Sequence, residues 1–74
     1  MNDLIINCKF KNGPTLTRGF DTIMDFIEAY EQLQFFYMEN NIEYIKLKFF
    51  DNIFNKKKFK TIHDAYIYCQ MIIK

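Results

Sequence analysis

The chain has 74 residues, half of them hydrophobic and 19% aromatic, with a formal net charge of +1. This composition excludes a disordered chain, and this length accommodates a single domain, residues 1–74. The small net charge excludes a chain-wide attraction to nucleic acid or to an anionic membrane.

Alternating residues 4–11 predict the first strand, with one side facing the core. The inward side holds Leu4, Ile6, Cys8 and Phe10, and the outward side holds Ile5, Asn7, Lys9 and Lys11. Asn12-Gly13 then predicts a hairpin turn. Because Pro14 cannot donate a hydrogen bond to a neighbouring strand, we expect the second strand, residues 15–20, at an edge of the sheet.

A helix is predicted from Thr22, because Thr22 followed three residues later by Asp25 has the pattern of a capping box. Apolar residues at helical spacing are expected on its buried face: Ile23, Phe26, Ile27, Tyr30, Leu33 and Tyr37. We expect this helix to end at Asn40-Asn41, since Asn tolerates the left-handed conformation that often terminates a helix.

The second half of the chain repeats this order of elements. Residues 42–50 alternate, with Ile45, Leu47 and Phe49 inward and Tyr44, Lys46, Lys48 and Phe50 outward. Asp51-Asn52 predicts a turn, and residues 55–60 a lysine-rich edge strand. A second helix is expected from Thr61, with its buried face made of Ile62, Ala65, Tyr66, Cys69 and Ile72.

The two halves align without gaps when the second is shifted by 39 positions, which places Phe20 on Phe59 and Thr22 on Thr61. We interpret this as a duplicated ββα unit, residues 4–40 and 42–74, since one such unit cannot bury its apolar face alone. The predicted fold is α+β: a four-stranded, mainly antiparallel sheet with two helices on one face. Chance similarity between two such units is the alternative.

Residues suited to catalysis or metal binding are scarce. The chain contains no serine and a single histidine, His63, while Cys8 and Cys69 are expected to be buried, reduced thiols. Gly13 and Gly19 are isolated, so there is no glycine-rich phosphate loop. We therefore expect no enzyme activity, metal, cofactor or small-molecule substrate.

The helices predict a protein interface. Five side chains lie off the expected core stripes of the two helices: Phe35, Phe36, Ile67, Tyr68 and Met71. A two-layer fold of this size has nothing to cover them, and exposed apolar clusters mark interaction sites. The alternative is that Phe35 and Phe36 fold under the following loop.

The open face of the sheet predicts a second surface. Basic and aromatic residues are expected on it or near its edge: Lys9, Lys11, Tyr44, Lys46, Lys48, Phe50, Lys56, Lys57 and Lys58. Such a face can bind single-stranded nucleic acid through phosphate contacts and stacking. The alternative is an ordinary solvated sheet face.

Phe, Tyr, Met, Ile, Asn and Lys, whose codons are AT-rich, make up more than half of the chain. This bias favours an AT-rich bacterium, its phage or another virus. We expect a small phage or mobile-element protein that binds and inhibits a host protein, as anti-CRISPR proteins do, and that acts in the cytoplasm, since the N-terminus lacks the pattern of a secretory signal. The partner is expected to be a host protein or a second copy; the alternative function is nucleic-acid binding.

Overall fold

The computed structural model describes residues 3–49 and 56–73. The helices and strands follow in this order: β1 (Leu4–Phe10), β2 (Thr15–Phe20), α1 (Ile23–Glu31), the 3-10 helix η1 (Phe36–Asn41), β3 (Ile42–Phe49), β4 (Lys56–Phe59) and α2 (Ile62–Ile72). The turn predicted at Asp51-Asn52 and the outward position predicted for Phe50 lie outside the described residues.

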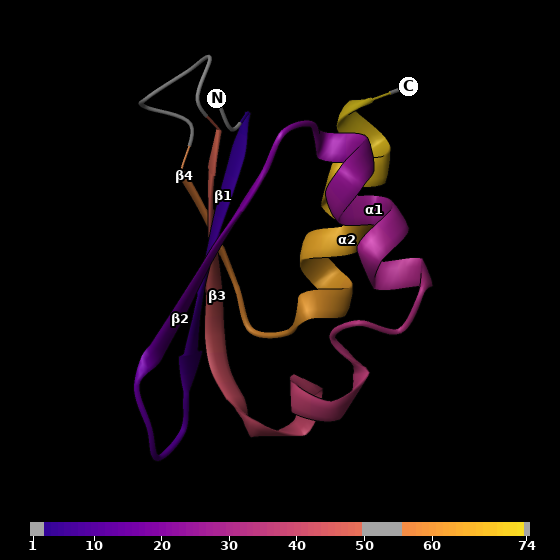
Figure 1. Cartoon of the computed structure of the whole chain (residues 1–74). Coiled ribbons are helices and arrows are strands. Elements are labelled where there is room, and N and C mark those ends of the chain that lie inside the picture. Colours follow the sequence, from indigo (N-terminus) through magenta and orange to yellow (C-terminus); the bar gives the residue numbers. More distant parts are fainter. Residues whose placement is uncertain (1–2, 50–55, 74) are drawn as a thin grey trace.

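The four strands form one antiparallel sheet in the order β2-β1-β3-β4. Both helices lie against the same face of this sheet, and the opposite face is open (Figure 1). The prediction of an α+β fold with a four-stranded antiparallel sheet and two helices is therefore confirmed. The expected edge positions of β2 and β4 are confirmed as well.

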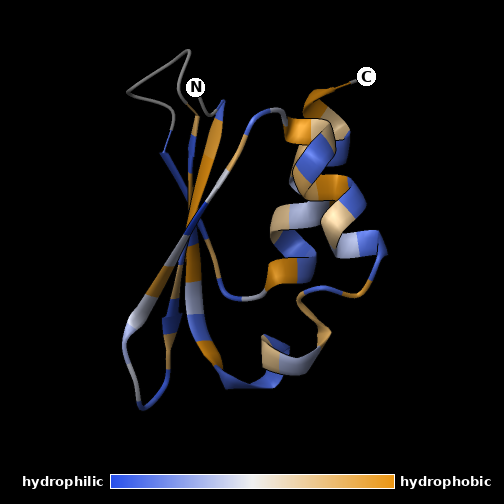
Figure 2. Ribbon diagram, viewed as in Figure 1, coloured by the Kyte–Doolittle hydropathy of each residue, from blue (hydrophilic) through white to orange (hydrophobic). Residues whose placement is uncertain are grey.

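The core lies between the sheet and the helices, and the alternation of β1 and β3 creates it. Figure 2 shows hydrophobic residues along both strands, with hydrophilic residues between them on β3. Leu4, Ile6 and Cys8 on β1 and Ile45 and Leu47 on β3 are wholly buried, as predicted. The helices contribute buried side chains that were also predicted, namely Phe26, Ile27, Ile62, Ala65 and Cys69.

Both helices begin as the sequence predicts. The backbone N–H of Asp25 donates to the Thr22 hydroxyl oxygen at 3.1 Å, and the Asp25 carboxylate accepts from the Thr22 N–H at 3.2 Å. At α2 the N–H of Asp64 donates to the Thr61 hydroxyl oxygen, also at 3.1 Å. These bonds satisfy backbone donors that the first turn of a helix leaves free.

The end predicted for the first helix is wrong. α1 ends at Glu31, because the N–H of Gln34 donates to the Ala29 carbonyl at 3.1 Å and the N–H of Leu33 to the Tyr30 carbonyl at 3.0 Å. This pair of bonds is a Schellman motif, and it places Leu33 in the left-handed region with φ of 63°. Glycine is the usual residue there, so the sequence contains no visible stop signal.

The early helix end reverses the predicted burial of the residues that follow. Leu33 and Tyr37, expected in the core, are 68% and 75% exposed. Phe35, expected on the surface, is 1% exposed, and its ring packs against Phe20 and Phe26 with centroids 6.2 and 5.7 Å away. Smaller corrections also concern the core: Ile72, the last residue of α2, is 41% exposed, and four residues expected in the core are only partly buried, namely Phe10, Ile23, Tyr30 and Tyr66.

We predict that Leu33→Gly stabilises the chain. The left-handed conformation costs a residue with a side chain about 1–2 kcal/mol, and glycine avoids this cost. Urea unfolding should therefore show a gain of about 1 kcal/mol. The control is Gln32→Gly, one residue earlier at φ of −84°, where the added flexibility should lower stability. A loss of stability in Leu33→Gly would contradict the Schellman ending.

Candidate functional site

Three of the five residues predicted to form a protein interface lie on the surface. Phe36 and Met71 are 71% and 68% exposed, and Ile67 is 40% exposed. Phe35 is buried, so its assignment to a surface is wrong. Tyr68 is half-buried, because its ring packs on Phe49 and Phe59 with centroids 6.0 and 5.5 Å away.

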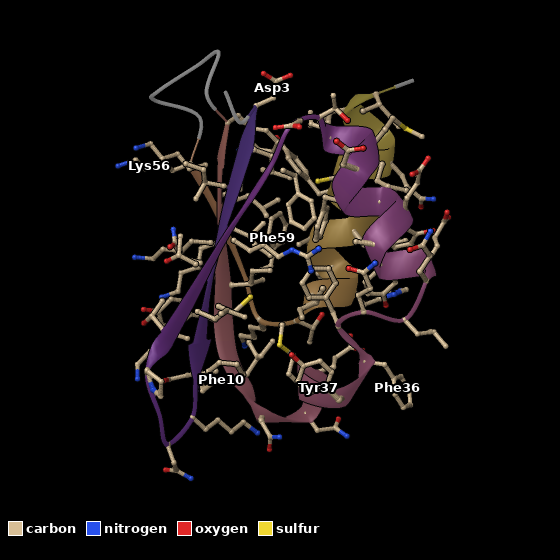
Figure 3. All side chains as sticks on the ribbon, viewed as in Figure 1. Asp3, Phe10, Phe36, Tyr37, Lys56 and Phe59 are labelled. Atoms are coloured by element: carbon tan, nitrogen blue, oxygen red, sulfur yellow. The ribbon has the colours of Figure 1, made fainter. Side chains whose placement is uncertain are left out.

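An aromatic patch, defined here as Tyr30, Leu33, Phe36, His63 and Tyr66, joins the two helices. The Tyr30 and Tyr66 rings stack with centroids 4.2 Å apart, and a 2.9 Å hydrogen bond joins the Tyr30 hydroxyl to Nδ1 of His63. Tyr30, Leu33 and Phe36 also line a hollow of about 50 Å³. Phe36 points away from the sheet, beneath α1 (Figure 3).

The exposed flank of α2 extends this patch. Ile67 and Met71 follow His63 at intervals of four residues, which places the three side chains one above another along the helix. The exposed surface therefore continues from Phe36 across Tyr30 and His63 to Ile67 and Met71. The structure brings together surface residues that the sequence assigned to two separate helices.

Two acidic side chains border the patch. The Tyr66 hydroxyl donates to the Glu31 carboxylate at 2.6 Å, and Glu39 lines the same hollow as Phe36. The bond to Glu31 is the largest cause that raises the pKa of Tyr66, while burial and the Glu39 carboxylate raise the pKa of Tyr30. Both phenols therefore stay protonated to higher pH than an ordinary tyrosine does.

Charge is separated between the two layers of the fold. Residues 21–45 and 61–73, which include both helices, contain no lysine or arginine. Lysine instead gathers on the two strands β3 and β4. Arg18 on β2 brings one basic side chain to this layer, because its guanidinium donates to the Gln34 side-chain oxygen at 2.9 Å.

The lysines predicted on the open sheet face divide into three groups. Strand register places Lys46, Lys48, Lys56 and Lys58 on the face that the helices leave uncovered, together with Tyr44 and Lys9. Lys57 pairs with buried Leu47 and so lies on the helix-covered face, where its ammonium is 5.9 Å from the centre of the Tyr68 ring. Lys11 lies in the hairpin turn.

The two cysteines lack the surroundings of a reactive thiol. Cys8 and Cys69 are wholly buried, and burial raises the pKa of the two thiols to about 11 and about 12. Neither is therefore an activated nucleophile. Within the described ranges, no group of three or more His, Cys, Asp and Glu side chains is arranged to hold a metal ion.

Two further observations bear on the class of protein. In the part of the chain that the structure describes, no helix has the length and apolar character needed to cross a membrane. Comparison of the chain with protein-family models, curated proteins and solved structures found no match.

Sequence reasoning missed several residues of the patch. It assigned Tyr30, Leu33 and Tyr66 to the core because their spacing is helical and their side chains are largely apolar. The hydroxyl groups of Tyr30 and Tyr66 are a signal for positions at the edge of a core, since buried tyrosines need a hydrogen-bond partner. For Leu33 the sequence carries no such signal.

We predict that stability falls as pH rises above about 9. The ordinary thiol pKa is 9.0, so the unfolded chain loses its thiol protons first, while folded Cys8 and Cys69 keep theirs to higher pH. The unfolded state then binds fewer protons, and the free energy of unfolding decreases with pH. Urea unfolding under reducing conditions at pH 8 and pH 10 measures this decrease.

The matched control for this measurement is the double variant Cys8→Ala/Cys69→Ala. The two alanine substitutions leave cavities in the core, which lower the stability of the variant at both pH values. The free energy of unfolding should nevertheless decrease less between pH 8 and pH 10 in the variant than in the unchanged chain. Parallel decreases in the two proteins would contradict the assignment to the thiols.

Proposed function

We propose that this chain is a non-enzymatic protein-binding module and that the aromatic patch, extended by Ile67 and Met71, is its binding surface. The observation that carries this proposal is the exposure of Leu33 and Phe36, 68% and 71%, beside the stacked pair of Tyr30 and Tyr66. Contiguous exposed apolar groups mark interaction sites. Aromatic and methionine side chains are enriched in interface cores.

The geometry of the patch favours tight docking. The Tyr30 ring is held by stacking and by its bond to His63, and the Tyr66 hydroxyl by Glu31 and by the Gln70 amide, which donates to it at 2.8 Å. Side chains that are already held lose little conformational freedom when a partner binds. Such residues are suited to act as anchors.

The charges around the patch favour a partner of opposite sign. Glu31 and Glu39 border the apolar side chains, so the complementary surface is an apolar segment flanked by lysine or arginine. A second copy that docked face to face would place these carboxylates against their own equivalents. A head-to-tail contact between the acidic helices and the basic strands would not close into a dimer. A different protein is therefore the favoured occupant.

The composition supports a proposal about the biological setting. A residue usage with AT-rich codons and the small size fit a phage or mobile-element accessory protein, whose partner would be a host protein that it inhibits. Inhibition by this route needs only a surface that occludes its target, and the aromatic patch is such a surface. Inhibition itself is tested by the activity of the partner once that partner is known.

We also propose that the fold arose by duplication of a ββα unit. Ile6 pairs with Leu47 and Cys8 with Ile45, while the shift of 39 positions equates Ile6 with Ile45 and Cys8 with Leu47. The pairing is thus symmetric about Asn7 and Lys46, as a twofold relation between two units requires. Related chains in which the two halves share no residues at this shift would contradict the proposal.

We predict that Phe36→Glu abolishes partner binding without unfolding the chain. The probe is a displayed library of random 16-residue peptides, selected on the immobilised protein. Enriched peptides should carry aromatic or aliphatic residues flanked by lysine or arginine. Their affinity should fall at least tenfold for Phe36→Glu, a loss of about 1.4 kcal/mol or more. Fluorescence anisotropy with the individual peptides measures this loss.

The matched control is Leu16→Glu, which exchanges another exposed apolar residue, 38% exposed on β2, for the same acid. It should leave peptide affinity unchanged, and both variants should unfold near the temperature of the unchanged chain. The absence of any enriched peptide, or equal affinity for Phe36→Glu, would contradict the proposal. A dimer that Phe36→Glu dissociates in light scattering would make a second copy the occupant.

A further inference from the structure

Four lysines form a compact array on the open face of the sheet. Strand register sets Lys46 directly opposite Lys58 and Lys48 directly opposite Lys56. Positions two apart on one strand point to the same face at a separation of about 6.6 Å, and directly opposite residues lie closer still. The array therefore concentrates four ammonium groups on one half of the sheet.

This arrangement opposes folding, so packing does not explain it. Like charges directly opposite one another on paired strands destabilise a sheet. Lysine on an edge strand such as β4 protects the edge, but this accounts for Lys56 and Lys58 and not for Lys46 and Lys48 on the central strand β3. Register thus places two pairs of like charges side by side on this face.

Among the residues that the structure describes, those in the same rows of the sheet as the array carry no negative charge. Across the sheet in the same rows lie Ile5 and Asn7 on β1 and Thr17 and Gly19 on β2, none of which is acidic. Glu43 lies at the irregularity in the pairing of β1 with β3 and lines a hollow together with Tyr44 and Lys58, at the end of these strands away from Lys48 and Lys56.

The array borders recessed surface that can hold a ligand. Asn7, Lys46, Lys48 and Lys56 line a hollow of about 310 Å³. Tyr44 and Lys58 line a second hollow of about 360 Å³ on the same pair of strands. The ammonium groups of Lys58 and Lys46 lie 4.3 and 5.4 Å from the centre of the Tyr44 ring, so one aromatic ring stands within reach of two cations.

We propose that this face binds single-stranded nucleic acid, independently of the protein-binding surface on the helices. Lys46, Lys48, Lys56 and Lys58 contact successive phosphates, and the Tyr44 ring stacks on a base. Lys9 is not part of this contact, because its ammonium donates to the Gly13 carbonyl at 2.8 Å and closes the hairpin turn. Binding is insensitive to base sequence, since every base offers a face for stacking.

Single strands fit this surface better than a duplex does. The grooves of a duplex are read by a helix or a two-stranded ribbon that projects into them. Here the charged residues lie on the face of a four-stranded sheet, and both helices are on the other side (Figure 1). A single strand can lie across the sheet with its phosphates on the lysines and a base on Tyr44.

Fluorescence anisotropy with labelled 15-nucleotide oligothymidine tests this proposal. With four phosphate contacts, a plot of log affinity against log salt concentration should have a slope of about −2.8. The affinity should therefore fall about 50-fold between 50 and 200 mM salt. Lys46→Gln/Lys58→Gln should lower affinity at 50 mM salt and reduce that loss to about sevenfold. The same variant should melt no lower than the unchanged chain, since it removes a repulsive pair.

The matched control is Lys11→Gln/Lys57→Gln, which changes the net charge equally but alters lysines outside the array. It should retain the affinity and the salt dependence of the unchanged chain. No binding at 50 mM salt, or equal losses in the two variants, would overturn the proposal. Tighter binding of a 15-base-pair duplex would exclude the single strand as occupant, and equal binding of polyglutamate would point to an acidic protein segment instead.

Discussion

The antiparallel pairing of β1 with β3 is the constraint on which the rest of this structure depends. It sets the wholly buried side chains of Ile6 and Cys8 beside those of Leu47 and Ile45, and the helices cover this apolar surface. Because side chains alternate between the two faces, the same register sends Lys46 and Lys48 to the opposite face. A slip of one residue would bury the lysines and expose the core. One pairing thus determines both the packing and the separation of charge.

The position at which α1 ends is the second determinant of the structure. It requires Leu33 to adopt a left-handed backbone conformation, which residues with a side chain disfavour. Leu33 adopts a conformation that glycine would adopt at lower cost, and strained residues of this kind are often retained for function. The turn directs Phe35 into the core and leaves Leu33 and Phe36 beside Tyr30 at the surface. A glycine at position 33 would be more stable but would remove an apolar side chain from the patch. This trade of stability for an exposed contact is common at binding sites.

The sequence predicts those parts of the fold that follow from short-range rules. Period-two alternation identifies β1 and β3, and Thr22 and Thr61 mark the helix starts through hydrogen bonds to residues three positions on. The end of α1 cannot be predicted in this way, because a leucine occupies the position where a stop signal would stand. The error shifts the helical phase of every residue after Leu33, which is why Phe35 and Tyr37 were assigned to the wrong environments. Lys57 shows a second limit of the sequence. Lysines stand on both sides of it, so the residue pattern does not indicate which face of the sheet it occupies. That face is determined by its pairing with buried Leu47 on β3.

We propose two separate binding surfaces of opposite charge, one on the helices and one on the open face of the sheet. Amide NMR spectra of the ¹⁵N-labelled chain test this proposal directly, recorded during titration with oligothymidine and, separately, with a peptide selected on the protein. Oligothymidine should shift the resonances of β3 and β4, among them Tyr44, Lys46 and Lys58. The peptide should shift those of α1, α2 and the segment that includes Leu33 and Phe36. If both ligands shift the same residues, or if neither shifts any, the two-surface account is wrong.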